Sequence, residues 1–221
     1  SFMNALEEKV LELIGESVES PDVFVDTDEG MAPIRDSIND AIQEIVMMTG
    51  CYRRQYLVPL REGQAFYRLR LNGHLGWITD AWSITNRRRL EQTDLIRLVT
   101  YSPRWMVDSA DPRAYFPIGN DIIGFYPKPS GDSNVIQLDL VEIPAAYTSD
   151  KDRVKLRDSF KYAAVHYAVS EYWASRGDAM EAQTHFAMYL DVLGLRQEYQ
   201  QQREQIRGLR TEKEPWPRAT G

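Results

Sequence analysis

The stretch VIQLDLVEI, residues 135–143, is the clearest structural signal in the chain, because its residues alternate between two faces. Ile136, Leu138 and Leu140 point to one face together with Glu142, and the residues between them point to the other. A period of two residues is typical of a β-strand that lies with one face on a core. The pattern therefore predicts a β-strand at residues 135–143.

The surrounding residues, about 52–144, have the same character. Aromatic and β-branched residues alternate with polar ones, and turn residues recur every several positions. The candidate strands are 55–59, 65–71, 75–83, 114–118, 121–126 and 135–143. Turn residues at 119–120 and 129–132 separate the last three strands, so these are expected to form an antiparallel meander. Residues 91–101 are compatible with one short helix.

Helical periodicity flanks this β-rich part on both sides. The spacing of apolar residues predicts helices at about 4–17, 33–49, 158–176 and 178–208. Pro33 is expected in the first turn of its helix, and Glu7 and Arg35 are expected on outward, polar faces. The predicted fold is α+β and mainly helical: N-terminal helices, a central antiparallel β meander, and a C-terminal long helix pair with an extended tail. We expect one domain over 1–208, followed by an extended C-terminal arm over 209–221.

The last predicted helix is unusually polar. Beyond Leu195 its only apolar residues are Tyr199, Ile206 and Leu209. Such a helix either projects into solvent or lies against a neighbouring subunit. The residues expected to contact a neighbouring subunit are Tyr199, Arg203, Ile206 and Arg207.

Charge limits the classes of partner. Lys and Arg number 26 against 33 Asp and Glu, for a net charge of -7, which argues against a protein that mainly coats phosphates. The one dense basic run, Arg87-Arg88-Arg89, predicts a loop that touches a DNA backbone in passing or pairs with an acidic partner. Together with Trp82, this run also allows a stacking platform for a single strand. No window approaches the ~20 apolar residues that cross a bilayer, so no membrane partner is expected.

Catalytic and metal-binding motifs are not apparent. The chain has three histidines and one cysteine, Cys51, and neither a nucleophile motif nor a phosphate-binding glycine loop is recognisable. His166 and His185 fall on consecutive helices with Glu171 and Glu181 nearby, so a metal site between these helices can be drawn. The favoured interpretation is a hydrogen-bonded histidine at a helix-packing edge. We expect no catalytic residue, no metal and no cofactor.

Several segments taken in order carry a resemblance to a known family. The first two are a helix at 33–48 with the core Asn39-Asp40-Ala41-Ile42 and a strand pair from 57–60 to 67–69. The third is Arg104-Trp105 followed by Asp111-Pro112-Arg113-Ala114-Tyr115-Phe116. The last two are a strand at 122–126 that ends in Tyr126-Pro127-Lys128-Pro129, and the link 143–150. Together they resemble the tailed-bacteriophage head-to-tail connector family, the adaptor or head-completion proteins. Family members often have Gly where this chain has Asp111.

The resemblance implies a structural role and not an enzyme. It implies a virion protein of the neck between capsid and tail, assembled in the host cytoplasm, whose partners are the portal protein, a tail or stopper protein and copies of itself in a ring that such families typically build with twelve subunits. Double-stranded DNA would pass transiently through the channel. In the family the C-terminal arm commonly docks on the portal, and the matching residues here are Leu209, Arg210, Pro215, Trp216, Pro217 and Arg218.

Three alternatives stay open at the level of sequence. The first is a virion-associated enzyme such as a cell-wall hydrolase, because the fold and not the spacing in sequence places a pair of catalytic carboxylates. The second is a tail completion protein with the same fold. The third is a nucleic-acid binder acting through Arg87, Arg88 and Arg89.

Overall fold

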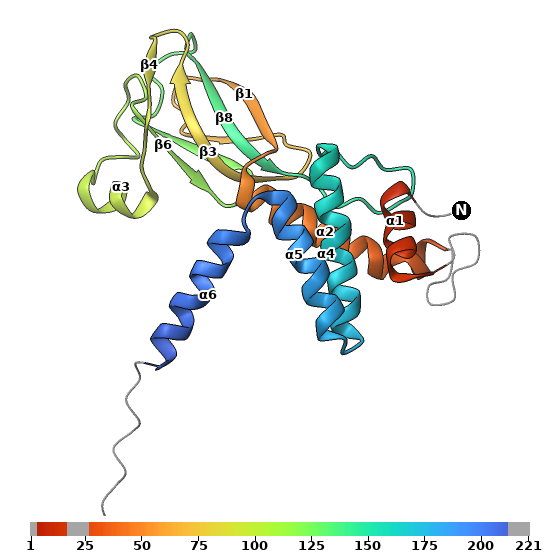
Figure 1. Ribbon diagram of the computed structural model, residues 1–221. Helices are drawn as coiled ribbons and strands as arrows, with labels where there is room; N and C mark the ends of the chain where they lie inside the picture. Colours follow the sequence, from red (N-terminus) through yellow and green to blue (C-terminus); the bar gives the residue numbers. More distant parts are fainter. Residues whose placement is uncertain (1–3, 17–26, 212–221) are drawn as a thin grey trace, which may run out of the picture. The chain divides into compact units, whose positions relative to one another are not determined.

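The computed structural model describes residues 4–16 and 27–211, with side chains described as far as Ile206 (Figure 1). The chain forms two compact units. The helical unit takes the residues up to Ala41 and those from Thr148 onward, and the β unit is Ile42–Tyr147. Helix α2 contributes to both units, because it spans Asp28–Thr49. The α+β class predicted from the sequence is confirmed.

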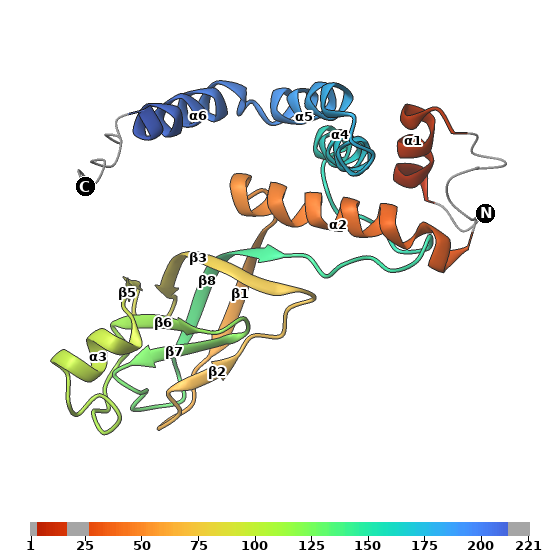
Figure 2. The same ribbon diagram turned by 90° about the horizontal axis from the view of Figure 1, so that it is seen from below.

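The helical unit contains the start of α2 and four further helices: α1 (Ala5–Ile14), α4 (Asp158–Ser175), α5 (Ala179–Leu193) and α6 (Arg196–Thr211). A capping box starts α1, in which Asn4 accepts the N–H of Glu7 and Glu7 accepts the N–H of Asn4. Helices α4 and α5 pack side by side, and α1 also packs on α4 (Figure 2). The two long helices therefore form the centre of this unit.

Two helix boundaries differ from the prediction. Helix α2 begins five residues before Pro33, because the Thr27 hydroxyl accepts the N–H of Gly30 and caps an earlier first turn. The single helix expected over 178–208 is two helices, α5 and α6. Gly194 adopts a left-handed φ of 69°, and the Leu195 N–H bonds back to the Leu190 carbonyl, which ends α5 there.

The β unit contains two four-stranded sheets and the short helix α3 (Leu95–Tyr101). The first sheet has the order β1 (Arg53–Pro59), β8 (Val135–Ile143), β3 (His74–Ser83), β4 (Arg88–Arg89), all antiparallel. The second has the order β2 (Phe66–Arg68), β7 (Ile122–Tyr126), β6 (Ala114–Ile118), β5 (Glu91–Gln92), with only β5 and β6 parallel. Strands β6 and β7 form the expected hairpin.

Strand β8 does not continue that hairpin as a meander; it lies between β1 and β3 in the other sheet. The predicted strand and its alternation are confirmed, and the structure shows which face is the inner one, since Ile136, Leu138 and Leu140 are buried in the core of the β unit. A central position satisfies the backbone groups on both edges of this apolar strand, which an outer position in a meander would leave half open.

The helical unit contains a buried cluster of charged residues that the sequence analysis expected to be exposed. Arg35 and Glu7 were expected on outward faces, yet both are buried, with the guanidinium Nε 2.6 Å from a Glu7 carboxylate oxygen. Arg35 also donates to Asp28 at 2.6 Å and to the Thr148 carbonyl at 3.1 Å. The charges are buried because they pair across α1, α2 and the chain that enters α4.

Among the described residues, none of the helices combines the length and hydropathy that spanning a bilayer requires.

Candidate interaction surfaces

Helix α6 places three of the four predicted subunit contacts on one face. Tyr199, Arg203 and Ile206 are spaced by four and three residues, and all three are exposed. The Tyr199 ring still meets Phe186 of α5 edge-on, with ring centroids 5.5 Å apart. Arg207 belongs to the same helix, but its side chain lies outside the description. The described part of α6 therefore presents a narrow apolar stripe within a strongly polar surface.

The predicted portal-binding residues fall at and beyond the end of α6. Leu209 and Arg210 lie in its last turn. Pro215, Trp216, Pro217 and Arg218 lie outside the described residues. The structure thus places the root of the arm on a helix.

The basic run lies at the edge of the first sheet. Arg87 ends the turn between β3 and β4 with a positive φ of 50°, and Arg88 and Arg89 form β4 opposite Ser83 and Trp82. Arg89 Nε lies 3.2 Å from a carboxylate oxygen of Asp80, so part of the positive charge is neutralised locally. All three arginines are exposed. The run is a small basic edge, which is too small to coat a nucleic acid.

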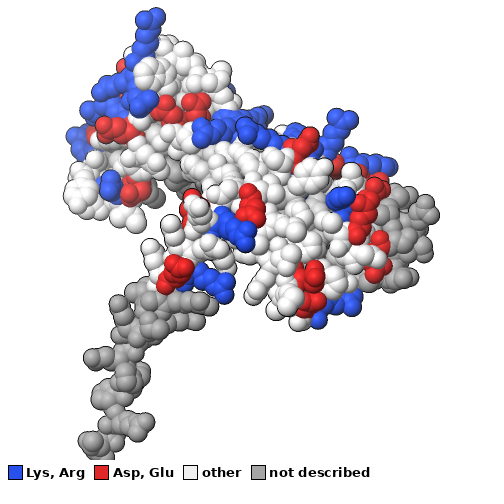
Figure 3. All heavy atoms as spheres, viewed as in Figure 1, with Lys and Arg blue, Asp and Glu red and all other residues white. Residues whose placement is uncertain are grey.

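The β unit carries an exposed apolar surface that the sequence interpretation missed. Ile96 and Tyr101 are each about four-fifths exposed. We call the whole set the α3 patch, consisting of Leu95, Ile96, Val99, Tyr101, Met106 and Val107. In Figure 3 the surface over α3 is mostly uncharged. The signal was present in the sequence, since α3 and the turn after it contain more large apolar residues than one buried face of seven residues can take.

A helix cap and packing contacts hold the α3 patch on the β unit. Asp94 caps α3 by accepting the N–H of Arg97, and Leu98 buries the inner side of the helix. In the following turn, the Trp105 ring meets Phe66 and Phe116 edge-on, with centroids 6.2 and 6.1 Å apart. The exposed apolar side chains therefore belong to a helix and a turn that are packed against the rest of the β unit.

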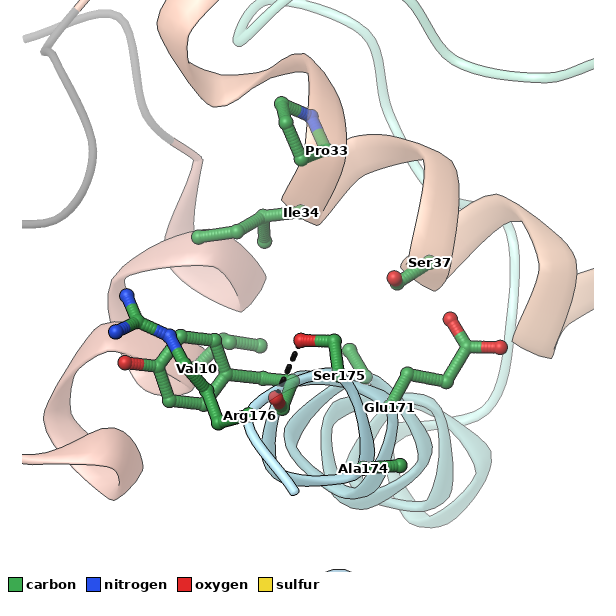
Figure 4. A pocket seen from close by; sticks show the side chains of 10 residues that line it. Val10, Pro33, Ile34, Ser37, Glu171, Ala174, Ser175 and Arg176 are labelled. Carbon is green, nitrogen blue, oxygen red and sulfur yellow. Dashed lines mark hydrogen bonds between the residues drawn. The ribbon is translucent and has the colours of Figure 1, made fainter. Parts of the chain in front are cut away.

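A hollow opens in the helical unit between α1, α2 and α4, with a volume of about 610 Å³ (Figure 4). Its walls are mostly apolar and include Val10, Ile34 and Ala168. At one end the Arg176 guanidinium covers the Tyr172 ring at 5.2 Å. We call this space the helical hollow; its remaining lining residues are Pro33, Ser37, Glu171, Ala174 and Ser175.

The histidine pair between α4 and α5 has the geometry of a hydrogen bond. The Nδ1 atoms of His166 and His185 are 3.2 Å apart, and the rings stack with 26° between their planes. One ring must donate and the other accept, so the pair is stable when both rings are neutral. Burial lowers the pKa of both histidines; the neighbouring charge of His185 adds to this for His166, and Glu181 opposes it for His185. The interpretation as a packing-edge histidine is confirmed.

The acidic partners drawn for a metal site are not gathered around this pair. Glu181 lies 3.9 Å from the Nε2 atom of His185, on the other ring nitrogen, and Glu171 lines the helical hollow. In the described part of the chain, no group of three or more His, Cys, Asp or Glu side chains is arranged to hold a metal ion.

The described residues thus present three exposed surfaces, which are one face of α6, the basic edge at β4 and the α3 patch. The sequence matches the family described as SU10 adaptor protein over residues 5–212, and the chain therefore belongs to that family. It is a structural adaptor protein of a bacteriophage, which confirms the resemblance seen in the sequence. A comparison with curated protein sequences gave no match.

Proposed function

We propose that this chain is the subunit of a ring of twelve copies, the number that such families typically build, and that this ring docks under the portal and links the capsid vertex to the tail. The observation that carries the proposal is α6, a helix of 16 residues whose described side chains are almost all exposed. Isolated helices of this length are marginal in water. A neighbouring subunit that covers Tyr199 and Ile206 would supply the missing burial.

The arm at 209–221 is the segment proposed to reach the portal. It begins in the last turn of α6, so a neighbouring subunit that covers α6 would bind beside the start of the arm. Trp216 is its proposed anchor, because a tryptophan that enters a pocket buries a large apolar area. A tail or stopper protein is the proposed partner on the opposite side of the ring.

The proposed ring surrounds part of the channel through which double-stranded DNA passes, in the neck of a virion assembled in the host cytoplasm. A net charge of -7 suits a channel that must not retain the genome, because like charges repel. Arg87 and Arg88 are exposed at the edge of the sheet formed by β4, where they are proposed to meet a phosphate backbone or an acidic partner.

Removal of residues 209–221 tests the arm. The shortened chain should keep nearly all of its helical circular dichroism and lose co-sedimentation with the portal ring encoded by the same genome. Trp216→Ala is the sharper version, with Tyr162→Ala, an exposed aromatic residue on α4, as its matched control. Portal binding that survives loss of the arm would contradict the assignment.

A further inference from the structure

The α3 patch is too large to be an incidental feature of the surface. Its six side chains expose an apolar area on the order of several hundred Å², comparable to the largest patch on a typical monomer, and such patches mark contact sites. A specific interface takes about 800 Å² from each partner. The α3 patch is therefore large enough to form the apolar centre of one side of such an interface.

The helical hollow offers a surface of the opposite shape. It has mostly apolar walls and a volume of about 610 Å³, in the range of roughly 300–1,000 Å³ that encloses a compact ligand. A few side chains of the size of Ile96, Val99 and Met106 would fill it. Apolar walls favour apolar occupants, because each buried CH₂ group contributes about 0.8 kcal/mol.

One side chain on each surface offers a complementary charge, with Arg176 lying away from Glu171 at the other side of the hollow (Figure 4). Glu171 reaches the wall of the helical hollow from α4, opposite Ser37 of α2 (Figure 4). On α3, Arg97 is exposed beside the patch, and its Nε is 3.5 Å from the Asp94 carboxylate in a contact open to solvent. Such an exposed pair contributes little, so Arg97 can exchange Asp94 for a carboxylate that becomes buried on docking.

We infer that the α3 patch of one copy of this chain seats in the helical hollow of the next copy, with Arg97 beside Glu171. The inference rests on the proposed ring and names a contact within it. A ring closes through heterologous contacts, in which two different surfaces of the same chain meet. The projecting patch and the hollow are two such surfaces, and every copy carries both.

Cysteine cross-linking tests the contact in the full chain. The chain has one cysteine, so Cys51→Ser gives a background without thiols. Ile96→Cys and Ser175→Cys then place one thiol on the patch and one at the hollow. A short bismaleimide should join copies head to tail and give a ladder that extends beyond dimers. The matched control pairs Ile96→Cys with Gln183→Cys, an exposed position on α5 outside the hollow, and should give little product.

A charge exchange separates a lost contact from a lost fold. Glu171→Arg and Arg97→Glu should each lower the yield of the ladder about fivefold or more, and the double variant should restore most of it, because the coupling between paired charges survives their exchange. Both measurements are made with the portal ring and with the concentrated chain alone. The portal samples also report how many chains bind per portal subunit.

The outcomes distinguish the inference from the proposed function. Portal binding without the 96–175 ladder would overturn the contact and leave the portal role standing. A ladder from the chain alone without portal binding would support the contact and count against the portal role. Three further results would each overturn the inference. The 96–183 control could give a ladder of equal yield, or the double charge variant could fail to restore the ladder. The third result is a cross-link from Ser175→Cys to Trp216→Cys in the arm in place of the patch.

Discussion

At the scale of single residues, Arg35 shows what sequence periodicity cannot predict. A helical pattern assigns charged residues to the outer face, and Arg35 and Glu7 follow that pattern in sequence. Both are nevertheless buried, because residues 28 positions apart meet as an ion pair. Burial by itself lowers the pKa of Arg35, but the hydrogen bonds and charges of Glu7 and Asp28 outweigh it and raise the pKa above its ordinary value. The charge is therefore retained inside the helical unit.

Arg35→Ala should strongly destabilise the helical unit. It leaves the buried carboxylate of Glu7 without its guanidinium, and breaking a buried pair from one side costs about 3–5 kcal/mol. Urea unfolding followed by circular dichroism measures the change. Lys9→Ala removes the exposed pair with Glu12 and should cost under about 1 kcal/mol. Equal losses for the two variants would show that Arg35 does not hold α1 to α2.

Gly124 is a second residue at which a single substitution should lower the stability of the fold. A Cβ atom at this position in β7 would collide with the Phe116 ring, so Gly124→Ala must displace a fully buried aromatic side chain. Overpacking of this kind costs about 1–3 kcal/mol. Gly131→Ala is the matched control, because a Cβ there meets nothing within 4 Å. A thermal melt should show a lower midpoint for the first variant alone; unchanged midpoints for both would contradict the packing of β7 on β6.

At the scale of elements, the sequence predicted the kinds of element better than their partners. Alternation in 135–143 identified the strand and the two sets of residues that share a face, because that information is local. The position of β8 between β1 and β3 depends on contacts far along the chain and left no local signal. The break at Gly194 was available in the sequence as a glycine stop, but the helical spacing that continues through Tyr199 and Ile206 obscured it.

The contact between α4 and α5 should weaken in mild acid. The pKa values of His166 and His185 are lowered from 6.5 in the folded protein, so the unfolded chain binds protons more readily. Stability from this pair is therefore complete above about pH 6.5 and is lost as the pH falls below that value. The melting temperature should decrease as the pH is lowered from about 7.5 to about 5.5.

The double variant His166→Gln, His185→Gln is the control for this pH dependence. Glutamine keeps a polar side chain at both positions and does not titrate, so the dependence should flatten in this range. A wild-type slope that persists in the double variant would assign the pH dependence to other groups.

At the scale of the whole molecule, the sequence predicted the class of protein and the exposure of the polar helix α6. Tyr199, Arg203 and Ile206 lie exposed on α6, as expected of a helix with so few apolar residues. The α3 patch was not predicted, although α3 and the turn after it contain more large apolar residues than the one buried face of a seven-residue helix can take. The helical hollow was also not predictable, because α1, α2 and α4 supply its walls from distant parts of the chain.

Docking on a portal, as one subunit of a ring, is the role that we propose for this adaptor. The most direct measurement is co-sedimentation of the full chain with the portal ring encoded by the same genome, titrated to saturation beside the chain alone. We predict saturation at one chain per portal subunit, including when the chain alone sediments as a monomer, since a template can assemble subunits that do not associate by themselves. A monomer in both tubes, with no binding at any chain concentration, would contradict the portal-docking role and favour a tail-side completion protein.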